Sequence, residues 1–184
     1  RGISLAFAPR GGVLQHLEVS DEGAMIAPLH HAPWAPDEVP ADAPPHQRWL
    51  AGDFLAAPFG PSPDGLHGLT ANGDWRVTPS GPATLRAVLE GAVQGATVVK
   101  ELSLADDHPF LYQRHLFIGG TGALPAANHA MISVPNGAKL SFSRKRWWET
   151  LPEPPETTRG RSCLAYPRRA EDAAAPPRPA APEV

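Results

Sequence analysis

The stretch ATVVKELSLADDHPFLYQRHLFI, residues 96–118, decides the fold class of this chain. Its two ends, residues 96–104 and 110–118, have the length and the β-branched and aromatic content of strands. Between them, the segment ADDHP at residues 105–109 carries the polar residues and the proline of a hairpin loop. The stretch therefore predicts two neighbouring antiparallel strands.

The same succession of strand and turn extends on both sides of this hairpin. Turn signals such as DEG at residues 21–23 and PNG at residues 135–137 separate short runs with strand character. Every window with helical character is interrupted by glycine or proline, so we predict no helix. The fold class that follows is all-β, a large antiparallel β-sandwich. Further strands are predicted at residues 2–7, 13–19, 24–29, 84–90, 130–134, 139–143 and 162–166.

Length and composition suit one domain built from short elements. The chain has 184 residues with 23 prolines and 17 glycines. We predict a β-sandwich domain over residues 1–169 and an Ala/Pro-rich tail that does not pack over residues 170–184. Residues 28–45 contain six prolines and are expected to form a long irregular loop. Because Arg1 opens directly into strand-like sequence, we expect the chain to be a fragment with an incomplete sandwich.

Charge and cysteine content exclude several classes of protein. A formal net charge of -3 provides no attraction for nucleic acid, and no apolar run approaches the ~20 residues of a membrane helix. The only cysteine, Cys163, excludes an internal disulfide framework and disfavours a zinc site built on cysteine. We therefore expect a soluble, cytoplasmic protein with no nucleic-acid or membrane partner, and its oligomeric state stays open.

The first candidate motif is GLHG at residues 65–68, which places His67 between two glycines. Glycine lets backbone approach a ligand closely, and a histidine in such a loop can project into a cleft. Asn72 and Trp75 follow closely. Amide groups and an aromatic ring suit a sugar, which needs hydrogen bonds for its hydroxyls and an apolar surface for its ring face. A glycine-rich turn with a surface histidine explains the same residues equally well.

The second candidate motif is Asn128-His129, which opens a predicted strand after the turn GGTG at residues 119–122. The side chain of His129 could point from a sheet face into a groove. Histidine can give or take a proton near neutral pH, as general acid catalysis requires. A core histidine bonded to backbone is the alternative, and spacing alone favours it.

Other histidines give no metal or cofactor signal. The histidines of the proline-rich loop lack matched carboxylates or HExxH spacing, and these are His30, His31 and His46. No Walker loop, GxGxxG motif or GxSxG elbow is present in the sequence. We therefore predict neither a metal nor a cofactor.

Two further patterns involve charged residues. Arg114 and His115 are neighbours on one predicted strand and so face opposite sides. The run RKRWW at residues 144–148 suits phosphate or nucleic acid. A solvated strand end with one buried tryptophan is the favoured interpretation of that run.

The segments GDF (52–54), APFG (57–60) and LHGLTANGDW (66–75) precede Asn128-His129 in one order along a strand-rich chain. Together they resemble the active-site segments of galactose mutarotase-like proteins, the aldose 1-epimerase family. The resemblance covers roughly Gly2 to Tyr166 and corresponds to the N-terminal part of the family's domain.

This resemblance implies a large twisted β-sandwich that binds a monosaccharide and interconverts its anomers by acid-base ring opening, without a cofactor. His129 would protonate the ring oxygen as general acid, and His67 would position or polarise the same region of the sugar. Five residues would bind the sugar: Asp53, Phe59, Asn72, Trp75 and Asn128.

Two parts of the family's pattern are not matched. Pro61 stands where the family has an arginine, and no glutamate of the chain aligns with the base that removes the anomeric proton. The alternative interpretation is therefore a non-catalytic carbohydrate-binding sandwich or an inactive fragment of an epimerase. The identity of the sugar, and whether it is phosphorylated, stays open.

Overall fold

The computed structural model describes residues 2–43, 47–48, 50–106, 108–137, 139, 141, 143–144, 146–150, 152 and 166–171. The chain divides into two compact units, Arg1–Pro135 and Asn136–Val184. Within the described ranges, no helix has the length and apolar character needed to cross a membrane.

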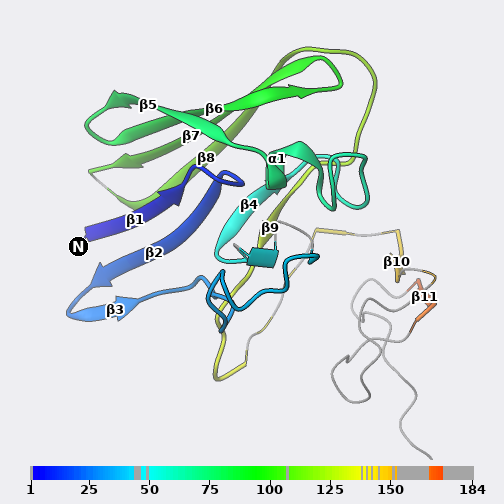
Figure 1. The fold of residues 1–184 in the computed structure, drawn as a ribbon. Coiled ribbons are helices and arrows are strands. Elements are labelled where there is room, and N and C mark those ends of the chain that lie inside the picture. Colours follow the sequence, from blue (N-terminus) through cyan, green and yellow to red (C-terminus); the bar gives the residue numbers. More distant parts are fainter. Residues whose placement is uncertain are drawn as a thin grey trace, which may run out of the picture. The chain divides into compact units, whose positions relative to one another are not determined.

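The first sheet of the larger unit is antiparallel throughout (Figure 1). β2 (Val13–Asp21) pairs antiparallel with β3 (Ala24–Ile26) next to the DEG turn, in agreement with the strands predicted at residues 13–19 and 24–29, although β3 ends at Ile26. β4 (Asp53–Ala56), the third strand in spatial order, was not predicted, because it is only four residues long and depends on its neighbours for pairing. The spatial order is β1 (Gly2–Ala8), β2 (Val13–Asp21), β4 (Asp53–Ala56) and β9 (Ala127–Ala130), with β3 (Ala24–Ile26) paired to β2.

The second sheet is a meander in which each strand pairs antiparallel with the next. Its strands are β5 (Trp75–Gly81), β6 (Thr84–Val93), β7 (Ala96–Ala105) and β8 (His108–Gly119). The predicted strands at residues 84–90, 96–104 and 110–118 are confirmed, whereas β5 is additional. The two sheets form separate layers in Figure 1, so the predicted all-β antiparallel fold class is confirmed.

The two layers meet through one face of each sheet. Leu55 on β4 belongs to a buried cluster with Trp75 and Val98 of the second sheet. Phe54, the preceding residue, belongs to a different buried cluster that includes Ala71. Because successive side chains of a strand point to opposite faces, Leu55 faces the space between the sheets and Phe54 faces away from it.

One short helix shows that the prediction of a helix-free chain was wrong. α1 (Gly68–Asn72) begins directly after His67, and its Thr70 is buried. A Cβ atom at Gly68 would lie 2.5 Å from the carbonyl oxygen of Ala57, so only glycine fits where the helix meets the end of β4. Five residues carry no measurable helical period, and tertiary packing rather than propensity forms such a turn.

The strand that carries His129 begins earlier than predicted. β9 covers Ala127–Ala130, whereas the pattern indicates residues 130–134. Beyond β9, in the part of the chain that the structure describes, Ile132 forms an isolated bridge with Leu29. The predicted strand at residues 139–143 is not formed at its described positions 139, 141 and 143, and positions 140 and 142 lie outside the described residues.

The smaller unit contains β10 (Trp148–Glu149) paired with β11 (Arg169–Ala170). The predicted strand at residues 162–166 lies outside the described residues except for its last position, which is not in a strand. Of the predicted tail at residues 170–184, the first residue belongs to β11, and residues 172–184 lie outside the described part.

The RKRWW run contributes aromatic surface to this smaller unit. Trp147 is 41% exposed, and the guanidinium of Arg169 lies 4.3 Å from its ring centroid. Trp148 is half-buried in β10. A cation placed over an indole is favourable, so Arg169 covers one tryptophan of the run.

Candidate functional site

His129 owes its position to the pairing of β4 with β9. In this register His129 lies directly opposite Phe54, so the two side chains share the face of the first sheet turned away from the second. Their rings stack with centroids 4.8 Å apart and an angle of 8° between the planes. One strand pair therefore fixes both the position and the ring plane of His129.

His67 is held by backbone strain and backbone hydrogen bonds. It precedes α1 with φ of 68°, a left-handed conformation that costs a residue other than glycine roughly 1–3 kcal/mol. Its N–H donates to the carbonyl of Gly60 at 2.7 Å, and its carbonyl accepts from the N–H of Ala57 at 3.3 Å. The hydroxyl of Thr70 also donates to the carbonyl of His67 at 3.3 Å. Strain held in this way is common where a side chain must be aimed for function.

The imidazole of His67 has a defined hydrogen-bonding role. The N–H of Gly60 donates to its Nδ1 at 3.3 Å, so Nδ1 acts as an acceptor. In the neutral ring the proton then lies on Nε2. The neutral His67 ring is therefore an N–H donor through Nε2.

The two predicted catalytic histidines meet in the structure. The ring centroids of His67 and His129 are 5.0 Å apart with the rings edge to face. Phe59 lies 4.9 Å from the first ring and 5.8 Å from the second, and it is 44% exposed. We call Phe54, Phe59, His67 and His129 the histidine–aromatic cluster.

Within this cluster, a buried imidazole nitrogen without a hydrogen-bond partner lies beside an exposed aromatic ring. Nδ1 of His129 is buried and has no hydrogen-bond partner, which is costly unless a ligand or water fills the role. The exposed ring of Phe59 offers an apolar face beside it. In the described residues, no group of three or more His, Cys, Asp or Glu side chains is arranged to hold a metal ion.

Two predicted sugar-binding residues lie on the other face of the same strands. Asp53 and Asn128 are each one position away from a member of the cluster on β4 or β9, so their side chains point to the opposite side of the sheet. Asp53 is only 6% exposed, and Asn128 is exposed. The structure therefore places these two side chains on the sheet face opposite to that of His129, although Asp53 still interacts electrostatically with His129.

Two other predicted sugar-binding residues have structural roles. Trp75 is 2% exposed, and its indole N–H donates to the carbonyl of Thr70 at 3.0 Å, so its ring is part of the core and has no face for a sugar. Asn72 donates through Nδ2 to the carbonyls of Leu66 and Gly68, both at 2.8 Å, and so closes the loop around His67. Of the five predicted binding residues, only Phe59 lies in the histidine–aromatic cluster.

A second group of polar residues lies between the two sheets and was missed by sequence reasoning. Nε2 of Gln113 on β8 donates to Oδ2 of Asp53 on β4 at 2.6 Å. Lys100 on β7 has no exposed surface, and its Nζ donates to the carbonyl of Gly12 at 2.6 Å. His115 lies directly opposite Lys100 in the strand register. We call Asp53, Lys100, Gln113 and His115 the inter-sheet polar cluster.

The charges of this cluster are perturbed by burial. Burial lowers the pKa of Lys100 to about 8, although the nearby Asp53 carboxylate opposes the change. Burial also lowers the pKa of His115 to about 4, and the Lys100 ammonium adds to this effect. For Asp53, burial raises the pKa against the opposing influences of the Gln113 hydrogen bond, Lys100 and His129. Each group is therefore pushed toward its neutral form.

One sequence signal could have identified Lys100. It alternates with Val98 and Leu102, which are both buried, in a predicted strand. The period of two therefore places its side chain on the core face. The partners Gln113 and Asp53 come from strands whose contact depends on how the sheets stack, and no local pattern contains that information.

Comparison of this chain with protein-family models, with curated proteins and with solved structures found no match.

Proposed function

We propose that the histidine–aromatic cluster binds a monosaccharide and interconverts its anomers. The observation that carries this proposal is the 5.0 Å separation of the rings of His67 and His129, which come from distant segments. The exposed Phe59 beside them suits the apolar face of a sugar ring, since aromatic rings pack against such faces. The resemblance of both segments to aldose 1-epimerase motifs supports the same chemistry.

The reaction needs two coupled proton transfers and no net redox change. An acid protonates the ring oxygen as the bond from C1 to that oxygen breaks, and a base takes the proton of the anomeric hydroxyl, which gives the open-chain aldehyde. Rotation about the C1–C2 bond and the reverse transfers close the ring as the other anomer. We assign the acid to His129, and we assign to His67 an Nε2–H hydrogen bond that orients the same oxygen.

A second candidate function is sugar binding without catalysis. It is favoured by the orientation of Asp53, the carboxylate next to Phe54 in sequence, which points into the interior and bonds to Gln113. A general base commonly contributes about 10²- to 10⁴-fold to a rate, so its absence would leave a binding protein.

Polarimetry separates the two candidates. The optical rotation of freshly dissolved α-glucose and α-galactose is followed with and without the protein. Acceleration that disappears in His129→Asn but persists in His16→Asn supports catalysis, since His16 lies on β2 and is a matched control outside the cluster. A rate equal to that of buffer, combined with sugar binding that Phe59→Ala weakens, supports the binding protein. If the protein neither accelerates the change in rotation nor binds the sugars, both candidates are removed for these sugars.

A further inference from the structure

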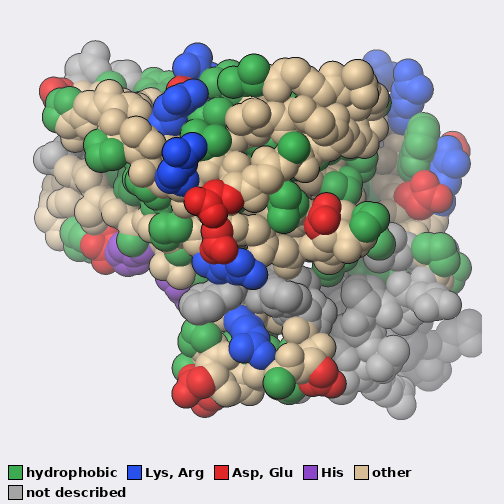
Figure 2. Space-filling view, turned by 45° about the horizontal axis from the view of Figure 1, so that its top comes forward, with side chains coloured by type: hydrophobic (Ala, Val, Ile, Leu, Met, Phe, Trp, Pro, Cys, Tyr) green, Lys and Arg blue, Asp and Glu red, His purple; other side chains and the backbone are tan. Residues whose placement is uncertain are grey.

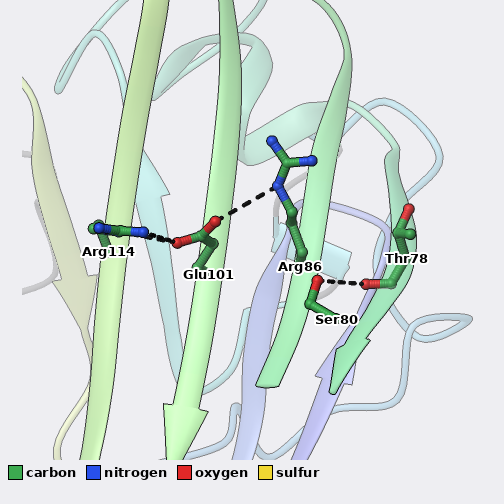
Figure 3. Close-up of polar contacts among 5 residues, drawn as sticks. All are labelled: Thr78, Ser80, Arg86, Glu101 and Arg114. Carbon is green, nitrogen blue, oxygen red and sulfur yellow. Dashed lines mark hydrogen bonds and ion pairs between the residues drawn. The ribbon is translucent and has the colours of Figure 1, made fainter.

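The outer face of the second sheet carries a row of polar side chains that the histidine–aromatic cluster does not use. Strand register aligns Thr78, Arg86, Glu101 and Arg114 across β5 to β8 (Figure 3). Lys100, the neighbour of Glu101, is fully buried between the sheets. Because neighbouring side chains alternate, the row faces away from the first sheet.

Two arginines share one carboxylate in this row. Arg114 donates to Oε2 of Glu101 through Nε at 2.9 Å and also through NH2. Nε of Arg86 lies 3.6 Å from Oε1 of the same carboxylate. The row therefore holds two positive charges against one negative charge. In Figure 3 the two terminal nitrogens of Arg86 lie on the side of its guanidinium that is turned away from Glu101.

An adjacent row adds hydroxyl groups and an aromatic ring. Thr84, Ser103 and Tyr112 are aligned by the same strand pairings, and Tyr112 is 50% exposed. Together with Glu101 and Arg114, these residues line a groove of about 620 Å³. Small-molecule sites commonly have volumes of ~300–1,000 Å³, so the groove has room for one or more sugar rings.

The chemistry of the groove narrows the class of ligand. Arg86 is not a lining residue but pairs with Glu101 at the border of the groove, and its guanidinium is in excess over the Glu101–Arg114 pair, which suits an anion. The phenol ring suits an apolar ring face, and the hydroxyls suit hydroxyl partners. A nucleic acid is disfavoured, because the chain has a formal net charge of -3 and Figure 2 shows acidic and basic side chains intermixed on the face it displays. Addition of a peptide strand is disfavoured in the groove, because the backbone of β7 is already paired on both sides.

We propose that this groove binds an acidic oligosaccharide, with a sugar ring against Tyr112 and a carboxylate of the sugar on Arg86, which borders the groove beside Glu101. The groove and the histidine–aromatic cluster lie on sheet faces that are turned away from each other, with both sheets between them. The binding site can therefore be tested independently of the proposed anomer interconversion.

The test is calorimetric titration of the full chain with an oligogalacturonate and with a neutral xylo-oligosaccharide of the same length. The acidic probe binds at low salt and weakens as salt rises, whereas the neutral probe binds less tightly. Arg86→Gln weakens binding about tenfold, the loss expected for a hydrogen bond to a charged group. Arg76→Gln removes the same charge one row away on β5, where residue 76 pairs with residue 88, and weakens binding less than Arg86→Gln, because Arg76 does not contact the sugar in the proposed complex.

Glu101→Gln tests in which direction the affinity for the acidic probe changes when the carboxylate is removed. Removal of the carboxylate releases both guanidinium groups, so affinity for the acidic probe is retained or increases. A loss of affinity in Glu101→Gln, equal effects of the Arg86 and Arg76 variants, or no preference for the acidic probe would overturn the proposal. Tighter binding of a single-stranded DNA oligonucleotide with the same dependence on Arg86 would assign the groove to nucleic acid instead. Circular dichroism and thermal melting confirm that each surface variant is folded.

Discussion

Gln113 and Asp53 are joined across the interior by a hydrogen bond of 2.6 Å from Nε2 of the amide to Oδ2 of the carboxylate. The bond connects β8 of the second sheet with β4 of the first, and Asp53 is only 6% exposed. A buried carboxylate has lost its hydration, so this amide replaces part of what water would supply. The polar contact therefore helps to set how the two sheets stack.

Replacement of Gln113 by leucine should destabilise the fold. The substitution introduces an apolar side chain of similar size but leaves Oδ2 of Asp53 buried without this donor. We expect the free energy of unfolding to fall by about 1–3 kcal/mol in urea titrations. The exposed control Arg76→Gln should change it by less than about 0.5 kcal/mol. If Gln113→Leu were as stable as the control, the hydrogen bond would contribute nothing to stability.

Lys100 should make the free energy of unfolding depend on pH in the alkaline range. Its pKa is lowered from 10.5 to about 8 by burial, so between these values the unfolded chain binds a proton that the folded chain does not. Stability attributable to this group therefore rises as pH increases from about 8 to 10.5, by up to about 3 kcal/mol. The difference between wild type and Lys100→Met, measured by urea unfolding at both ends of this window, isolates the effect. If the difference in free energy of unfolding between wild type and Lys100→Met were the same at both pH values, the lowered pKa of Lys100 would be contradicted.

His115 should make stability depend on acidic pH. Burial and the Lys100 charge lower its pKa from 6.5 to about 4, so in this window the unfolded chain again binds the extra proton. Stability should therefore fall as pH is lowered through the window, and His115→Gln should lose less stability than wild type. Thermal melting at neutral pH and near pH 4.5 measures this. His16→Gln on β2 is the control and should follow wild type.

Gly68→Ala should disrupt the start of α1. Gly68 has φ of 73°, and an added Cβ would lie 2.5 Å from the carbonyl oxygen of Ala57, so both conformation and space oppose a side chain. Gly23→Ala is a matched control, because Gly23 has φ of 85° with nothing within 4 Å of an added Cβ. We expect about 1 kcal/mol of destabilisation for the control and at least twice that for Gly68→Ala. Equal losses in chemical unfolding would mean that only the backbone conformation matters.

His129→Asn should separate catalysis from binding. Asparagine preserves a polar side chain but cannot act as the acid, so the proposed anomer interconversion should stop while sugar affinity stays within about tenfold. Polarimetry measures the rate, and calorimetric titration with the same sugar measures the affinity. Equal losses of rate and affinity would instead make His129 an anchoring residue.

Several features of the fold were predictable from local sequence. The β-branched and aromatic runs at residues 84–90, 96–104 and 110–118 became β6, β7 and β8, because strands of this length are recognisable from composition and flanking turns. The four-residue strand β4 and the five-residue helix α1 were not, because they are too short for a periodic pattern. Both form where neighbouring segments supply their contacts.

Some residues of the candidate site were likewise predictable from local sequence, and others were not. The glycines around His67 and the motif Asn128-His129 identified the two histidines, and the structure brings them to a ring separation of 5.0 Å. The role of Trp75 could not be inferred, since a tryptophan near a loop suits a ligand and a core equally well. Its exposure of 2% follows from the first sheet packing over it, since Leu55 of β4 belongs to the same buried cluster.

The alternation of side chains along β4 is a property of the extended chain, so Phe54 and Asp53 had to face opposite ways wherever they lay. Which of them would meet His129 and which would enter the interior depended on the partner that covered each face. The stacking of the second sheet on Asp53 and Leu55 left Phe54 to the histidines and placed Asp53 against Gln113. Contacts between residues so far apart in sequence arise only when the whole chain has folded, because burial is a property of the assembled layers and not of any single strand.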